Sequence, residues 1–196
     1  MVTKELLQTI ISGSVRQAVL NVIPLEVNPG KYHNLLSKSF VASVGNQLME
    51  IYKEIDCDLC FRNWNYEKQI GISGEWLLDI VIAKRRPIND RVGYIHELIL
   101  ALESEMAAGS KAFVDDFSKL LVVNAPIKVY INGVEAKDKK SRYIESRLKL
   151  IQDILANYNN NDKYYICFVD HPSVWPKIDK PLVIVEDMIS NTFQMQ

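Results

Sequence analysis

The chain has 196 residues, 48% of them apolar and 24% charged, with a formal net charge of −1. These values are typical of a soluble globular protein and argue against a strongly basic coat for nucleic acid. No apolar run reaches the roughly 18 residues of a membrane span, and the start lacks the pattern of a signal peptide. Three cysteines are too few for a disulfide framework, so we expect a cytoplasmic protein.

Two amphipathic helices are predicted first. Apolar residues recur at helical spacing from Leu6 to Val19, and the pair Pro29-Gly30 then breaks the pattern. A second apolar stripe of the same period predicts a helix over about residues 32–55.

The period then changes to that of strands. Residues 64–70 alternate between apolar and polar, residues 75–84 (EWLLDIVIAK) are apolar on both faces, and residues 97–106 (ELILALESEM) form a third run. Together they predict three successive strands.

Helices and strands alternate in the second half. The pattern predicts helices over 110–122 and 141–158, and strands over 126–132, 164–170 and 182–186. The helix between the third and fourth strands predicts a right-handed parallel crossover. We therefore expect one domain over 1–196, an α/β fold with a mixed sheet of about five strands and helices on both sides.

Carboxylates stand inside or at the end of two apolar strands. Asp79 lies in WLLDIVI, and Glu103 and Glu105 lie in LALESEM. Side chains alternate along a strand, so Glu103 and Glu105 point to one face, roughly 6.6 Å apart. Carboxylates are rarely buried unless paired or bound to metal, and Mg²⁺ prefers oxygen ligands. The sequence predicts a magnesium site; the alternative is a solvated strand end whose acids have no role.

This order of elements and acids resembles the PD-(D/E)XK nuclease superfamily, the fold of many restriction endonucleases. The family carries an Asp on the second core strand and an acid-x-Lys on the third, which Asp79 and Glu103-Ser104-Glu105 match in part. The resemblance covers about residues 34–132 and implies a restriction-endonuclease-like mixed sheet flanked by helices. Glu50 or Glu54 would supply an acid that some members carry on the preceding helix.

Two departures from the family pattern are present. Leu78 replaces the Pro before Asp79, and Glu105 occupies the lysine position. A few restriction enzymes of this type have Glu-x-Glu, and a lysine can come from the next helix, where Lys111 and Lys119 are candidates. The alternative is that the chain is a relative of these enzymes that has lost the ability to cleave nucleic acid.

The resemblance implies a Mg²⁺-dependent endonuclease that hydrolyses DNA, in restriction or phage defence, as a homodimer. Asp79 and Glu103 would bind the metal with Glu50, Glu105 would bind metal or orient the attacking water, and Lys119 would supply the positive charge. The alternatives are a non-catalytic module that binds nucleic acid or a protein, and an unrelated α/β protein that acts on small molecules.

Two groups of basic residues are candidates for contact with phosphate. The alternative for each group is a solvated loop without a role in binding. The favoured group adjoins the Asp79 strand and comprises Lys84, Arg85, Arg86 and Arg91. The second group precedes the long helix and comprises Lys137, Lys139, Lys140 and Arg142.

Overall fold

The computed structural model describes residues 2–22, 29–52, 57–61, 77–88, 93–107, 109–135, 139–158 and 161–189. Two helices come first, α1 (Lys4–Val22) and α2 (Pro29–Tyr52). Three strands follow: β1 (Cys57–Phe61), β2 (Ile80–Pro87) and β3 (Gly93–Glu105). The chain continues through α3 (Ser110–Val122), β4 (Ile127–Val134), α4 (Lys140–Leu155), β5 (Lys163–Asp170), the 3₁₀ turn η2 (Trp175–Lys177) and β6 (Val183–Ile189).

All described strands join one six-stranded sheet in the order β1-β2-β3-β4-β5-β6. Strands β1, β2 and β3 form an antiparallel meander, β4 and β5 each run parallel to the strand before them, and β6 is antiparallel to β5. The predicted α/β class, the mixed sheet and the parallel crossover through α3 are therefore confirmed. The strand predicted over 64–70 lies outside the described residues, and β1 was not predicted.

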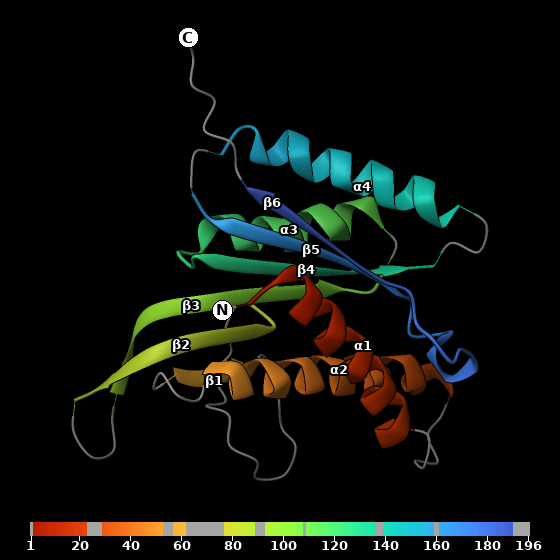
Figure 1. Cartoon of the computed structure of the whole chain (residues 1–196), viewed down its shortest axis with the longest axis horizontal. Coiled ribbons are helices and arrows are strands. Elements are labelled where there is room, and N and C mark those ends of the chain that lie inside the picture. Colours follow the sequence, from red (N-terminus) through yellow and green to blue (C-terminus); the bar gives the residue numbers. More distant parts are fainter. Residues whose placement is uncertain are drawn as a thin grey trace.

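Helices cover both faces of this sheet (Figure 1). Helices α1 and α2 pack on one face, where Ile80 and Ile82 of β2 point. Helices α3 and α4 pack on the other, where Val81 of β2 belongs to the same buried cluster as Phe113 and Phe117 of α3. Burial on both faces explains why the central strands are apolar without alternation. None of the helices in the described ranges is both long and apolar enough to cross a bilayer.

Several element boundaries differ from the expected ones. Helix α2 begins at Pro29 and not near residue 32 as expected. Proline and glycine are tolerated in a first helical turn, where backbone N–H groups have no partner within the helix, so Pro29 and Gly30 do not prevent this start. Strand β2 begins only at Ile80, so Asp79 lies just before the strand rather than inside it. Helix α3 begins at Ser110, as the sequence predicted.

Strand β3 is longer than its partner β4. It has 13 residues, but β4 pairs only with its last part, from Leu100 to Glu105. The first part of β3 and the end of β2 therefore form a hairpin arm, in which Arg86 pairs with Tyr94. This arm extends the β2–β3 pair past the start of β4.

Candidate active site

Asp79 is fixed against the end of β3. The pairing of β2 with β3 matches Ile80 to Leu102, so the next position along each strand brings Asp79 to Glu103. The Oδ2 atom of Asp79 accepts hydrogen bonds from the backbone N–H of Ser104 at 2.9 Å and from its hydroxyl at 2.6 Å. These bonds hold a half-buried carboxylate beside the acids of β3.

Glu103 is the buried acid of the site. It is 1% exposed and lies opposite Tyr130 in the β3–β4 pair. Burial and the nearby charge of Asp79 raise its pKa to about 8, although the Lys119 ammonium opposes this shift. Within the described residues its Oε1 atom accepts no hydrogen bond, and the Nζ of Lys119 lies 3.4 Å away. That ion pair is longer than the roughly 2.7–2.9 Å of a charge-assisted hydrogen bond.

Glu105 ends the strand two residues later. Its Oε1 atom accepts a hydrogen bond of 2.6 Å from the backbone N–H of Ala107. Its pKa is raised, first by burial, and also by contact with the Asp116 carboxylate and the charge of Asp79, whereas the Ala107 N–H lowers it. The charges of Asp79 and Asp116 thus raise the pKa of both Glu103 and Glu105, as expected for two acids on one strand face.

Asp116 of α3 is the residue that the sequence analysis missed. It forms an ion pair with Lys119, one helical turn further on. Its position follows Phe113 by three and precedes Phe117 by one, so it lies within the apolar stripe that faces the sheet. A lone acid in such a stripe was the available signal, because an acid on the buried side of a helix needs a partner.

Lys119 reaches the acids, and the other α3 candidate does not. Its side chain is 21% exposed and lies between Glu103 and Asp116. Lys111 is exposed in the first turn of α3.

Glu50 is exposed on α2, the helix that covers the face opposite to α3. The charges that shift the pKa of Glu103 are those of Asp79, Lys119 and Asp116. Glu54 lies outside the described residues.

The two basic groups lie at different ends of the sheet. Lys84 and Arg86 are on the hairpin arm, while Arg91 and the side chain of Arg85 lie outside the described part. From Tyr94 on this arm to Glu103, β3 spans about 30 Å at roughly 3.3 Å per residue. Closeness to Asp79 in sequence did not bring this group to the acids, because β2 runs away from Asp79.

The second basic group lies at the end of the sheet where β3 ends with Glu103 and Glu105. The Tyr143 hydroxyl of α4 donates to Asn132 Oδ1 at 2.8 Å, and Asn132 Nδ2 donates to the carbonyl of Glu105 at 2.9 Å. Lys139 and Arg142, within a turn of Tyr143, are exposed there. Lys140 is paired with Asp170, and Lys137 lies outside the described residues.

The acids of the site do not close around a divalent cation in the described residues. In the described ranges no three His, Cys, Asp or Glu side chains converge closely enough to hold one ion. Carboxylate oxygens such as those of Asp79, Glu103 and Glu105 are the ligand type that Mg²⁺ takes, although the Oε1 atom of Glu103 faces the Lys119 ammonium. Asp79, Glu103 and Glu105 are the residues that would hold it.

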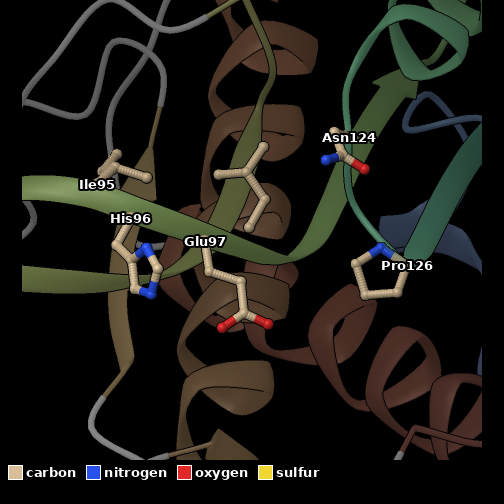
Figure 2. Close-up of a pocket in the computed structure, with 6 residues that line it drawn as sticks. Ile95, His96, Glu97, Asn124 and Pro126 are labelled. Carbon is tan, nitrogen blue, oxygen red and sulfur yellow. The ribbon is translucent and has the colours of Figure 1, made fainter.

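A separate cavity of about 460 Å³ lies at the other half of β3. In Figure 2, Ile95, His96 and Glu97 follow one another along β3, and Asn124 and Pro126 belong to the segment before β4. None of the acids Asp79, Glu103 and Glu105 lines this cavity, and about 16 Å of strand separates its Leu98 from Glu103. Glu97 is paired there with Lys84 at 2.9 Å.

Comparison with known proteins adds no relative. No protein-family model, no curated protein and no solved structure matches the chain.

Proposed function

We propose that the chain is a Mg²⁺-dependent endonuclease with a restriction-endonuclease-like fold that hydrolyses phosphodiester bonds of DNA. The observation that carries the proposal is the buried Glu103 carboxylate, whose Oε1 lacks a hydrogen bond in the described part and lies beside Asp79, Glu105 and Lys119. The order of helix, three-stranded antiparallel meander, helix and parallel strand supports it.

The residue types suit phosphodiester hydrolysis. A bound Mg²⁺ activates water and neutralises charge on the phosphate. Asp79, oriented by Ser104, and Glu103 would hold the ion. The raised pKa of Glu105 suits a general base that takes the proton of the attacking water.

Lys119 supplies the positive charge that the family usually takes from the third strand. The ammonium of Lys119 lies 3.4 Å from Glu103 Oε1, and its pKa is raised: burial lowers it, but the neighbouring Asp116 and Glu103 outweigh that effect. It therefore stays charged at neutral pH and can stabilise negative charge on the phosphate.

Removal of Asp79 tests this function. Wild-type protein should nick supercoiled plasmid with Mg²⁺ or Mn²⁺, and Asp79→Ala should lower the rate at least about 100-fold, which is about 2.7 kcal/mol of barrier. Asp115→Ala is the matched control, because Asp115 is an exposed acid next to Asp116 on the same helix. Circular dichroism checks that each variant is folded.

Two outcomes would contradict the proposal. One is an Asp79→Ala protein that cuts at the wild-type rate. The other is absence of cleavage of any DNA or RNA with either metal ion, which would leave a non-catalytic module that binds nucleic acid or a protein partner.

A further inference from the structure

The first part of β3 leaves one backbone edge without a partner strand. Strand β2 pairs with β3 from Gly93 onward, but β4 pairs with it only from Leu100, and within the described ranges no other strand adjoins β3. Pro126, directly before β4, does not extend this pairing, because it has no N–H and its carbonyl accepts a hydrogen bond of 3.0 Å from the backbone N–H of Lys163. Over roughly 20 Å, this edge therefore presents backbone groups that no described strand takes up.

The cavity of about 460 Å³ lies along this edge. Its lining comes from four consecutive residues of β3 and, across the gap, from Asn124 and Pro126 (Figure 2). Ile95 and Leu98 of β3 are partly buried and pack against the core of the α3 face, so the cavity has an apolar wall. The position next to β3, in line with β4, is thus open and bordered by apolar side chains.

The chemistry of the edge favours a polypeptide over DNA. A strand edge offers both N–H donors and C=O acceptors, and an added strand satisfies both kinds of group. DNA phosphates can contact basic side chains of the hairpin arm, but the phosphate backbone has no donor for the carbonyl groups of β3.

The charge of the arm favours an acidic segment. Residues 84–98 contain four basic and two acidic residues, so their formal net charge is +2, whereas that of the whole chain is −1. Glu97 is already paired with Lys84 at 2.9 Å, and Arg86 is exposed. A second copy of the chain would bring two positive arms together, which repel each other. An extended segment that alternates apolar and acidic residues complements both the apolar wall and the positive charge.

We propose that the edge of β3 before Leu100 binds an extended, acidic segment of a partner protein, which adds a strand to the sheet in the position that β4 leaves open. Main-chain hydrogen bonds to β3 supply affinity, and the apolar wall formed by Ile95 and Leu98 selects the side chains that face it. This binding does not depend on cleavage of DNA.

A short synthetic peptide that alternates valine with glutamate is the probe. In fluorescence anisotropy it should bind saturably, at least about tenfold more tightly than the same peptide with lysine in place of glutamate. Every second N–H of an added strand points to β3, so methylation of the peptide nitrogens should abolish binding at alternate positions and have little effect between them. Exchange of the backbone amides of residues 95–98 should slow when the peptide binds.

Ile95→Glu tests the groove on the protein side. It removes an apolar contact of the cavity, so it should weaken binding of the acidic peptide at least about tenfold. Ile88→Glu is the matched control, because it adds the same charge to the arm at a side chain that is 65% exposed and does not line the cavity. Circular dichroism checks the fold of both variants, and the methylated peptides test the wild-type protein whether or not a variant folds.

Several results would overturn the proposal. They are the absence of saturable binding, equal binding of the lysine peptide, and equal loss of binding at every methylated position. A wild-type dimer in sedimentation that Ile95→Glu converts to a monomer would show that a second copy occupies the edge. Slower exchange of the amides of residues 95–98 with duplex DNA, and not with the peptide, would show that DNA occupies it.

Discussion

Glu103 carries the largest electrostatic penalty among the acids of the site. Its side chain is removed from water, and burial outweighs the attraction of Lys119, so its pKa rises to about 8. Alternation along β3 predicted that Glu103 and Glu105 share a face. It could not predict Asp116, whose approach to Glu105 depends on how α3 packs on the sheet.

The pH dependence of stability tests the environment of Glu103. Without metal, the folded protein holds a proton on Glu103 up to pH about 8, whereas the unfolded chain releases it near 4.5. The free energy of unfolding should therefore fall as pH rises between these values, by up to about 1.4 kcal/mol per pH unit. The raised pKa of Glu105 acts in the same direction.

Urea unfolding in EDTA at pH 5, 6, 7 and 8 measures this dependence. Glu103→Gln cannot ionise, so its stability should depend less on pH and should exceed that of the wild type at pH 8. Equal pH dependence of the two proteins would show that Glu103 ionises normally. Added Mg²⁺ should restore wild-type stability at pH 8, because it favours the ionised carboxylates.

At the level of elements, the end of β4 packs tightly against the segment after β3. A Cβ atom on Gly133 would lie 2.6 Å from the carbonyl oxygen of Met106 and 2.9 Å from its Cα. Both are backbone atoms that no side-chain rotation can move away. The close approach keeps the chain after Glu105 next to Asn132, which donates to the Glu105 carbonyl.

Gly133→Ala should therefore destabilise the protein by about 1–3 kcal/mol, because the backbone of β3 or β4 must shift. Gly13→Ala is the control: its Cβ would lie 3.6 Å from Gln47, an ordinary contact, and alanine favours a helix interior by roughly 0.5–1 kcal/mol. Denaturant unfolding compares the two variants. A Gly133→Ala protein as stable as the wild type would show that this junction tolerates a side chain.

At the level of the whole molecule, sequence periodicity predicted the helices and strands that are determined by the local pattern of apolar residues. It identified α3 and α4, whose buried faces repeat at 3.6 residues, and β4 and β5, which are short apolar runs buried on both faces; their alternation predicted the parallel crossover. Sequence periodicity could not predict the distance between the hairpin arm and the acids. That distance depends on the length and direction of β2 and β3, and on where β4 begins to pair.

The two basic groups should therefore contact DNA at different distances from the cut. Arg142 lies at the edge that holds the acids, while Arg86 lies at the level of Tyr94, about 30 Å of strand from Glu103. Ten base pairs span about 34 Å, so a 10-bp duplex centred on the cut reaches only about 17 Å to each side. A 30-bp duplex extends past the arm.

Binding to the two duplexes in EDTA separates these contacts. On 30 bp, Arg86→Ala and Arg142→Ala should each lower the slope of log affinity against log salt by about 0.9, the loss of one phosphate contact. On 10 bp, only Arg142→Ala should have this effect. Lys149→Ala, an exposed change further along α4, is the control. If Arg86→Ala lowers the slope equally on both duplexes, the arm contacts DNA near the cut, and the expected separation of the two contacts is wrong.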